Sequence, residues 1–449
     1  MGLTGIAIFK LLPKTNCGDC GVPTCLAFAM NLAAAKAELD ACPHVSEAAK
    51  EQLAADSAPP IRLLTIGTGD YAVKVGGETV MFRHEKTFVN PPGFAALVST
   101  DEDGASVDGK IARFKACQYD RVGLNLRPEV FAVKDAGDAA KFAALVKKVA
   151  DGCGAALILM SDKADAMKAA LAETKGKKPL IYAATAANAD EFGALAKEAD
   201  CPLAVRGDGS LDSVIALTEK LTALGLKDLV IDTGSRELKK VFEQQIIIRR
   251  SALKDRFRPL GFPTIVFANE MADGLAEESL VAATFVAKYG ALIVMSDFQA
   301  HSVFPLLLER LNIYTDPQRP MTAEQGIYPI NNPDEMSPVL VTCNFSLTYF
   351  IVSGEIESSR VPAWLLVQDT EGLSVMTAWA AGKFSGESAG TFINKCGIKD
   401  KIKHKSFVIP GYAAGISGEL EEEIPGYNVV VGPREASQIP KFLKSWKPT

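Results

Sequence analysis

Four cysteines near the start of the chain constrain its fold more than any other feature. They follow the spacing C-x2-C-x4-C-x16-C, at positions Cys17, Cys20, Cys25 and Cys42. Pro43 follows the last of them, as in many bacterial cluster motifs. Gly18 and Gly21 flank the second, which allows a tight loop without Cβ clashes. Three thiolates from one loop and a distant fourth are the usual ligand set of a [4Fe-4S] cluster, so the spacing predicts one here.

Zinc and disulfides are the alternative uses of these cysteines. Zinc sites usually combine two C-x2-C pairs, or one pair with histidines, whereas one close pair is followed here by single cysteines. Disulfides require an oxidising compartment, and the opening residues MGLTGIAIFK lack a cleavable signal pattern. The cluster is favoured, and both alternatives stay open. The other cysteines occur singly and are expected to be small buried residues: Cys117, Cys153, Cys201, Cys343 and Cys396.

The segment between Cys25 and Cys42 has to bend if both residues bind one cluster. A straight helix, rising about 1.5 Å per residue, would separate them by roughly 25 Å. We therefore predict that the Ala-rich helix starting near Thr24 breaks near Ala35. A further helix is predicted from Ser46 to Leu53.

Length and charge limit the classes of protein. The chain has 449 residues, more than one hydrophobic core supports, which predicts two or three domains. Its net charge of -6 argues against a nucleic-acid partner. No apolar run is as long as the roughly 18 residues of a membrane-spanning helix, so no membrane association is expected. Together with the missing signal pattern, these features predict a cytoplasmic protein.

We predict an α/β protein of four segments: a [4Fe-4S] domain over 1–57, a linker with a β-hairpin over 58–93, a TIM (β/α)8 barrel over 94–322 and a doubly wound α/β domain over 323–449. In the linker, Ala58-Pro59-Pro60 interrupts the pattern, and Gly76-Gly77 is a hairpin signal. The strands predicted there are Ile61–Gly67, Tyr71–Val75 and Glu78–Phe82.

From Phe94 onward, short apolar runs alternate with helical stretches, and eight such units over about 230 residues match a TIM barrel. Val130–Val133 competes for the place of the second strand. The predicted strands are Ala95–Ser99, Arg121–Leu126, Ala155–Met160, Leu180–Ala183, Leu203–Val205, Leu229–Ile231, Thr264–Phe267 and Leu292–Met295.

Barrel active sites lie at the carboxyl ends of the strands. Polar residues occur there, but Asp, Ser and Thr after a strand commonly cap the next helix, and no strand end carries a histidine. We therefore expect these residues to be structural and predict no catalytic residues. They are Ser161, Asp162, Arg206, Asp208, Asp232, Thr233, Asn269, Glu270 and Asp297.

The last segment repeats the alternation, with strands expected at Val339–Thr342, Trp364–Val367, Ser406–Ile409 and Asn428–Val431. Ligands of doubly wound sheets bind beyond the carboxyl ends of the strands, and all four ends here are rich in small or polar residues. The expected binding residues are Thr342, Asn344, Ser346, Leu347, Thr370, Glu371, Gly372, Leu373, Ser374, Gly411, Tyr412, Ala413, Ala414, Gly415, Gly432, Pro433, Arg434, Glu435 and Ala436.

With these modules in this order, the chain resembles the large (gamma) subunit of the corrinoid/iron–sulfur proteins of the reductive acetyl-CoA (Wood–Ljungdahl) pathway. The resemblance covers the whole length and rests most firmly on NCGDCGVPTCLAFAMNLA followed by DACP. It implies cluster ligation by the four cysteines and a corrinoid-binding C-terminal domain. The implied function is that of a methyl carrier, which receives a methyl group on Co(I) and passes it to acetyl-CoA synthase.

The resemblance also implies the partners. These are a small TIM-barrel subunit that forms a heterodimer with this chain, a methyltetrahydrofolate:corrinoid methyltransferase, acetyl-CoA synthase, and a reductive activator or ferredoxin. The cluster would reduce Co(II) when Co(I) is lost to oxidation. The methyl carrier has to reach several partners, so we expect hinges near Ala58–Pro60 and Arg319–Asp334.

The usual corrinoid fingerprint, Asp-x-His-x-x-Gly, is absent from the chain. His404 lies just before a predicted strand, at the wrong edge to bind cobalt. The family pattern is a base-off corrinoid, of the cobalamin type, with no protein ligand to cobalt. Small side chains such as Asn344, Thr370 or Ser374 are then expected below the metal. An axial nitrogen ligand would stabilise the higher oxidation states, so its absence favours reduction.

Two other functions stay open at this point. The chain could be an electron-transfer or scaffold subunit that has a cluster but no corrinoid. Alternatively, the barrel itself could bind a pterin and act as a methyltransferase, which the Asp and Asn residues at its strand ends permit.

Overall fold

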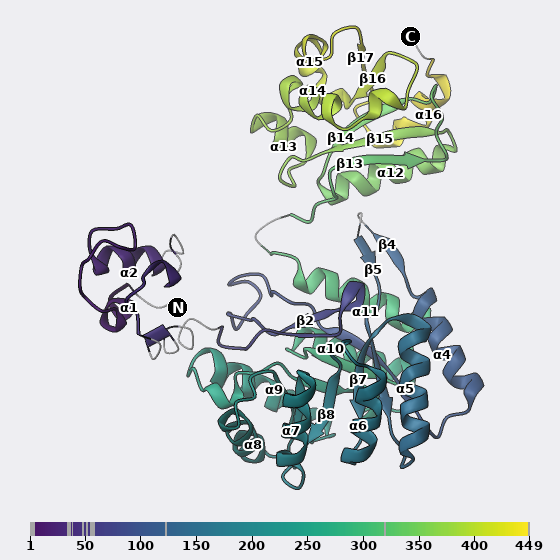
Figure 1. Cartoon of the computed structure of the whole chain (residues 1–449). Coiled ribbons are helices and arrows are strands. Elements are labelled where there is room, and N and C mark those ends of the chain that lie inside the picture. The colour runs from purple at the N-terminus through teal and green to yellow at the C-terminus, as the bar shows by residue number, and fades with distance from the viewer. Residues whose placement is uncertain are drawn as a thin grey trace.

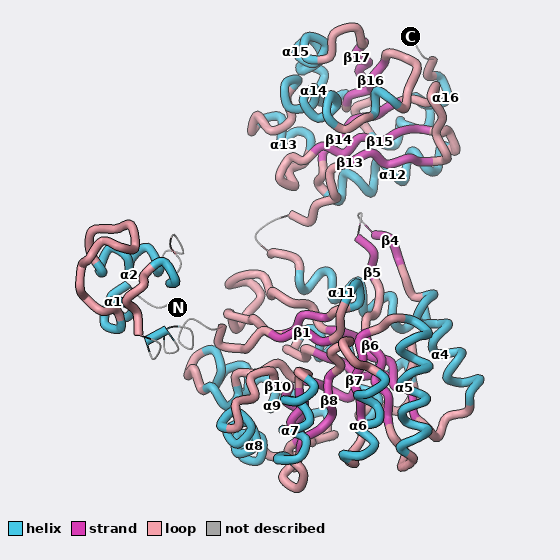
Figure 2. The backbone as a smooth tube through the Cα atoms, in the orientation of Figure 1, coloured by secondary structure: helices cyan, strands magenta, loops and turns pink. Residues whose placement is uncertain are grey.

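The computed structural model describes the chain apart from residues 1–4, 34–36, 38, 47–48, 51–52, 54–58, 122–123, 318–319 and 448–449. Figure 1 shows three parts, which are a small helical module at the N-terminus, a central barrel and a C-terminal α/β unit. The tube in Figure 2 shows that strands occur in the second and third parts and helices in all three. No helix among the described residues combines the length and apolar character needed to cross a membrane.

The N-terminal module contains the helices α1 (Gly5–Leu11) and α2 (Cys25–Ala33) and the 3-10 turn η1 (Leu39–Ala41). Ile8, Phe28 and Ala29 form its small core, and the buried cysteines Cys25 and Cys42 belong to the same core. The α2 helix ends well before Cys42, as the ligand spacing requires. The predicted break at Ala35 itself lies outside the described residues. Most of the helix predicted from Ser46 lies outside them too, although Ala49, Lys50 and Leu53 are helical.

The strands β1 (Leu64–Ile66) and β2 (Val73–Val75) pair antiparallel around the turn η2 (Gly69–Tyr71). Their buried side chains pack against the starts of the barrel strands, so this hairpin closes the amino-terminal end of the barrel.

The predicted strand Glu78–Phe82, and with it the hairpin at Gly76-Gly77, is wrong. The carboxylate of Glu78 is buried 3.0 Å from Arg249 and accepts a hydrogen bond from the backbone N–H of Val89. A loop, and not a strand, brings Glu78 to both partners. Gly76 has φ +84° and lies so close to the carbonyl of Arg62 that a Cβ would be 1.9 Å from it.

The barrel is an eight-stranded parallel sheet in the order β10-β9-β8-β7-β6-β3-β12-β11. A parallel bridge between Ile231 and Thr264 joins β10 to β11, which confirms the predicted TIM barrel. Its strands are β3 (Gly93–Ser99), β6 (Val130–Lys134), β7 (Ala156–Met160), β8 (Leu180–Ala184), β9 (Leu203–Arg206), β10 (Leu229–Asp232), β11 (Ile265–Phe267) and β12 (Leu292–Met295).

Helices surround this sheet (Figure 1). They are α4 (Gly104–Ala116), α5 (Ala139–Cys153), α6 (Ala164–Glu173), α7 (Ala189–Ala199), α8 (Leu211–Ala223), α9 (Leu238–Leu253), α10 (Leu275–Ala287) and α11 (Ala300–Tyr314), with the 3-10 turns η3 (Arg258–Leu260) and η4 (Ala268–Glu270).

The prediction that Arg121–Leu126 forms the second barrel strand is wrong. Its residues belong to a separate antiparallel hairpin of β4 (Tyr119–Arg121) and β5 (Leu124–Leu126). The competing segment forms the barrel strand β6, in which Val130 to Val133 are fully buried. A parallel strand in a barrel is covered on both faces, and the polar 119–125 stretch cannot meet that requirement.

The C-terminal unit is a five-stranded sheet in the order β13-β15-β14-β16-β17. The antiparallel edge strand β13 (Gly326–Ile330) was not predicted, and it contains Pro329, which an edge tolerates. The other strands run parallel and confirm the prediction: β14 (Val339–Cys343), β15 (Ala363–Gln368), β16 (Ser406–Ile409) and β17 (Asn428–Val431).

Two hydrophobic cores lie on opposite faces of this sheet, which confirms the doubly wound α/β class. The helices α12 (Ser346–Ser359) and α16 (Ile439–Ser445) cover one face. The helices α13 (Val375–Ala380), α14 (Gly386–Lys395) and α15 (Ser417–Glu423) cover the other, with the 3-10 turns η5 (Ile398–Asp400) and η6 (Gly411–Ile416), and η7 (Ala436–Gln438) precedes α16.

Candidate cofactor sites

Two of the four predicted cluster ligands lie in the loop before α2, and a third, Cys25, is the first residue of that helix. Gly18 and Gly21 have positive φ angles of 83° and 81°, and the N–H of Gly21 donates to the carbonyl of Gly18. The side chain of Asn16 accepts a 2.8 Å hydrogen bond from the backbone N–H of Cys25. These bonds fold the loop around Cys20, the use of glycine that the sequence predicted.

The structure gives the spacing and the exposure of the four cysteine sulfurs. All four thiols are free, so they form no disulfide. Among the described residues, no three of these sulfurs lie within 4.8 Å of one another. Sulfurs that share one zinc ion, each at about 2.3 Å, would be roughly 4 Å apart. The described cysteine sulfurs are therefore not gathered around one point, although the sulfur of Cys17 lies within 4.8 Å of ligand atoms of Asp19 and His44. Cys25 and Cys42 are buried, whereas Cys17 is exposed.

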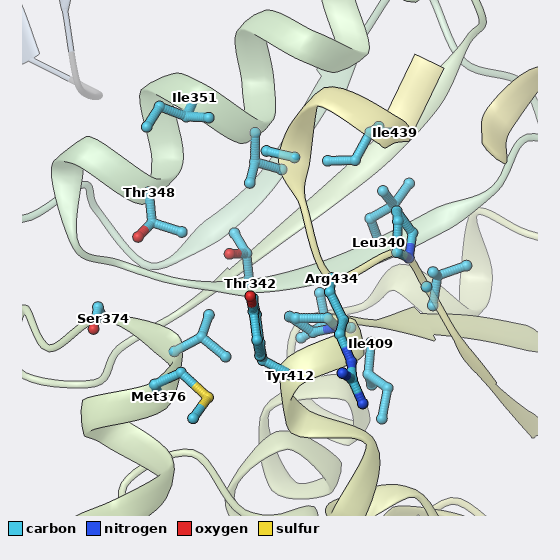
Figure 3. Close-up of a pocket in the computed structure, with 18 residues that line it drawn as sticks. Leu340, Thr342, Thr348, Ile351, Ser374, Met376, Ile409, Tyr412, Arg434 and Ile439 are labelled. Carbon is cyan, nitrogen blue, oxygen red and sulfur yellow. The ribbon is translucent and has the colours of Figure 1, made fainter. Parts of the chain in front are cut away.

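The C-terminal unit contains a cavity of about 280 Å³ at the carboxyl ends of β14, β16 and β17. Figure 3 shows Thr342 between Thr348 and Tyr412 on its wall, with Arg434 beside Tyr412. The cavity lies at the sheet edge where the sequence predicted a ligand. Its predicted lining residues are Thr342, Ser374, Tyr412, Gly432, Pro433, Arg434 and Ala436.

The other predicted residues do not line this cavity. Leu347 is exposed on α12, Ser346 begins that helix, and Ala413 is fully buried in the core on the α13–α15 face of the sheet. Ala414 and Gly415 belong to the 3-10 turn η6.

Asn344 organises the loop after β15. Its side-chain oxygen accepts hydrogen bonds from the N–H and hydroxyl of Thr370 and from the N–H of Gly372, each at 3.0 Å. Glu371 and Gly372 both have positive φ angles, and Leu373 packs against the core. The loop is held in one shape beside Ser374, which lines the cavity.

Two loops meet at the mouth of the cavity. A Cβ on Gly411 would lie 2.6 Å from the carbonyl oxygen of Gly432, so only glycine permits this approach. Tyr412 donates a 2.7 Å hydrogen bond to Glu435, and this bond raises the pKa of Tyr412 above its ordinary value. The loops after β16 and β17 are therefore joined across the mouth.

The cavity wall contains a polar atom without a partner. The hydroxyl of Thr342 is buried and forms no hydrogen bond among the described residues, which is costly unless a ligand or water completes it. Most of the lining is apolar, and Arg434 is its one charged residue. The residues described as lining the cavity include no histidine. His404 lies before β16, at the opposite edge of the sheet, as predicted. Its side chain forms a hydrogen bond with the carbonyl oxygen of Ser337.

Sequence reasoning missed most of the lining, because all of the missed residues except Pro410 lie within strands and helices and most of them look like ordinary core residues. One signal was available: the first half of α12 is mostly apolar, and Leu347 and Ile351 are exposed on it. The missed residues are Leu340, Val341, Thr348, Ile351, Val352, Val375, Met376, Val408, Ile409, Pro410 and Ile439.

At the mouth of the barrel, the polar strand-end residues bind one another. Asp232 is buried, accepts a 2.5 Å hydrogen bond from Tyr182 and pairs with Arg236, which also pairs with Glu270. Asp162 pairs with Arg206, and Asp297 pairs with Arg113.

Two others order the loops before the next helices. Ser161 accepts a bond from the N–H of Lys163, and Asp208 accepts one from Ser210. Thr233 is buried beside Asp232. These contacts match the structural role that we expected, although Asn269 keeps a buried oxygen without a partner among the described residues.

Two family models match the chain. A family described as the CO dehydrogenase/acetyl-CoA synthase delta subunit matches residues 63–443, and an Fe-S cluster family matches residues 12–44. The corrinoid/iron-sulfur protein large subunit of Moorella thermoacetica is 46% identical over 99% of both chains.

Archaeal relatives are similar over the same extent. The acetyl-CoA decarbonylase/synthase complex subunit gamma of Methanopyrus kandleri is 35% identical over 98% of this chain and 97% of its own. That of Archaeoglobus fulgidus is 36% identical over 99% and 98%. The chain belongs to the family of corrinoid/iron–sulfur protein large subunits and acetyl-CoA decarbonylase/synthase gamma subunits.

Proposed function

We propose that this chain is a methyl carrier that binds a corrinoid at the C-terminal cavity and a [4Fe-4S] cluster in the N-terminal module. In this role it receives a methyl group from methyltetrahydrofolate through a methyltransferase and delivers it to acetyl-CoA synthase. The observation that carries the proposal is the apolar cavity at the strand ends, with the buried hydroxyl of Thr342 unpartnered in its wall.

The cavity, of about 280 Å³, is too small for a whole corrinoid. We therefore propose that it holds one part of the cofactor, the nucleotide base. A nucleotide base displaced from cobalt is flat and largely apolar, which suits a pocket lined by Leu340, Ile351, Val352 and Val408. Thr342 could hydrogen-bond a ring nitrogen of that base. Arg434 lies at the mouth, where it could pair with the phosphate that joins base and ring.

The loops at the mouth would then face the corrin ring. Tyr412 and Glu435 on one side and the Asn344-ordered loop on the other are held by hydrogen bonds before any ligand binds. Such a preorganised surface loses little freedom on binding. When bound, the corrinoid would supply the methyl-accepting cobalt, and the chain would supply orientation and a lower face without a histidine ligand.

The cluster module would serve reduction and not methyl transfer. Iron–sulfur potentials span roughly −700 to +450 mV and depend on hydrogen bonds and exposure. An exposed Cys17 beside two buried cysteines gives the site one open edge for electron exchange with a reductive activator or ferredoxin. We further propose a small TIM-barrel subunit as a heterodimer partner, because the Moorella relative is named a large subunit.

The proposal is tested by the change Cys42→Ala in the full chain. Three ligands remain in one loop, so we expect a damaged, three-iron cluster and loss of electron-driven reactivation. Methyl uptake should persist when the corrinoid is reduced chemically. The measurements are iron content, EPR and methyl transfer from methyltetrahydrofolate with the methyltransferase added. Loss of methyl uptake even after chemical reduction would contradict the separation of the two roles.

Purified protein that contains a cluster but takes up no cobalamin would support the alternative of an electron-transfer scaffold. Methyltetrahydrofolate binding by this chain alone would support the pterin-binding barrel. At the barrel mouth Asp232, Arg236 and Glu270 pair with one another, and the buried oxygen of Asn269 has no partner among the described residues.

A further inference from the structure

One side-chain hydrogen bond connects distant parts of the cluster module. The ring nitrogen Nε2 of His44 lies 2.7 Å from Oδ2 of Asp19. Asp19 stands between Cys17 and Cys20 in the ligand loop, and His44 stands two residues after Cys42. Both side chains are about half exposed, at 48% and 53%, so neither belongs to the hydrophobic core.

The position of this bond is unusual because of what it joins. Asn16 already ties Cys25 to its own loop, and the N–H of Cys42 donates to the carbonyl of Leu39 within its own segment. Among the described residues, the bond between Asp19 and His44 is the one side-chain hydrogen bond between the loop of three ligands and the segment that carries the fourth.

The bond also lies beside the exposed edge of the site. The sulfur of Cys17, a carboxylate oxygen of Asp19 and a ring nitrogen of His44 all lie within 4.8 Å of one another. Cys17 is the exposed cysteine of the four. A segment that moved away from the loop would withdraw Cys42 and open this edge together.

We infer that Asp19 and His44 form a clasp that holds the fourth ligand segment against the ligand loop and slows the loss of iron from the cluster. This inference rests on the cluster of the proposed function. Asp19 and His44 are positioning residues, and they bind the cysteine-bearing segments and not the iron.

The expected effect is modest, because exposed ion pairs and hydrogen bonds contribute little. Breaking the clasp should accelerate iron release by about two- to five-fold. The cluster should still form, since four cysteines remain and the core of Ile8, Phe28 and Ala29 is untouched. A double variant should lose iron no faster than either single variant, because each change removes the same bond.

The experiment uses the full chain with its cluster loaded anaerobically, and follows iron release to a ferrous-iron chelator by absorbance. The variants are Asp19→Ala, His44→Ala and the pair together. His44→Gln keeps a side-chain N–H donor and should restore much of the wild-type rate. Asp40→Ala is the matched control, because it removes an exposed carboxylate two residues before Cys42 without touching the clasp.

Faster release in Asp19→Ala and His44→Ala, with a normal rate in Asp40→Ala, would support the clasp. Failure of Asp19→Ala to load iron while His44→Ala loads normally would overturn it, because the two changes remove the same bond. Equal rates in Asp19→Ala and Asp40→Ala, or additive effects in the double variant, would overturn it. If the wild type itself holds no four-iron cluster, the proposed cofactor fails, which is a distinct result.

Discussion

The barrel mouth and the C-terminal sheet edge have similar residue types after their strands but differ in how these residues are hydrogen-bonded. Both place Asp, Asn, Ser and Thr after parallel strands, where ligands of α/β folds bind. In the barrel, Asp232 is satisfied by Tyr182 and Arg236. In the C-terminal unit, the hydroxyl of Thr342 faces a cavity and has no partner among the described residues.

This difference separates structural polar groups from ligand-binding ones. A buried polar group is stabilising only when it is hydrogen-bonded. A network whose buried polar groups all hydrogen-bond one another needs no ligand. A buried polar group that has no partner and lies beside a cavity marks a candidate ligand-binding site. Residue type and position after a strand do not distinguish the two cases, and the pairing of each atom does.

The change Asp232→Ala should have the largest effect on stability. It leaves Arg236 and the buried hydroxyl of Tyr182 without their shared partner, so we expect a loss of about 3 kcal/mol in the free energy of unfolding of the barrel. Circular dichroism during denaturation measures it, because all three tryptophans lie in the C-terminal unit. Asp162→Ala removes an exposed pair and should cost under about 1 kcal/mol. Reduced cobalamin binding by native Asp232→Ala protein would contradict the separation of the two regions.

The change Thr348→Trp should fill the C-terminal cavity from α12. We expect cobalamin affinity to fall by at least about tenfold, which corresponds to roughly 1.4 kcal/mol, with little change in the fold. Glu357→Trp places the same side chain on the same helix outside the cavity and should bind normally. Equal affinities of the two variants, by titration of the apoprotein, would show that this cavity is not the corrinoid site.

Thr342→Val should stabilise the protein, whereas most core substitutions destabilise it. Without ligand, it removes an unpartnered buried hydroxyl and should raise the stability of the C-terminal unit by about 1 kcal/mol. Thr370→Val removes a hydroxyl that bonds Asn344 and Leu373 and should lower stability by about as much. Tryptophan fluorescence during denaturation compares them. A destabilised Thr342→Val variant would mean that the hydroxyl is satisfied in solution.

Arg121→Ala should have the smallest effect. Arg121, on the β4–β5 hairpin of the barrel, lies 4.6 Å from the ring centroid of Phe350 on α12, and Figure 1 shows the hairpin extending toward that helix. A cation–π contact of this kind contributes about 0.5–1 kcal/mol. Its loss should shift the populations of domain positions about two- to five-fold, measured as distances between labels on the barrel and the C-terminal unit. An unchanged distribution, as expected for Asp120→Ala, would remove this contact from the account.

The sequence predicted most of the fold because apolar runs and breaks are local signals. Local signals could not decide which of two segments forms the second barrel strand. The structure places Val130–Val133 there, because a barrel strand is buried on both faces.

Local signals also could not show that Glu78 lies in a loop, because its conformation depends on the distant partner Arg249. Both hinges remain predictions, and Ala58 and Arg319 lie outside the described residues.

The two proposed cofactor sites were predictable to different degrees. The proposed cluster ligands are specified by their spacing within one short stretch. The cavity is assembled from residues between Leu340 and Ile439, and seven of the predicted residues line it. The apolar residues of its wall are indistinguishable from core residues until the sheet is formed.

The most direct test is an anaerobic absorption and EPR spectrum of the protein, isolated after corrinoid-replete expression with the proposed small subunit. We predict a base-off Co(II) signal without nitrogen superhyperfine splitting, together with a signal from a reducible [4Fe-4S] cluster. A cluster signal without cobalt under these conditions would contradict the methyl-carrier function and leave an electron-transfer subunit.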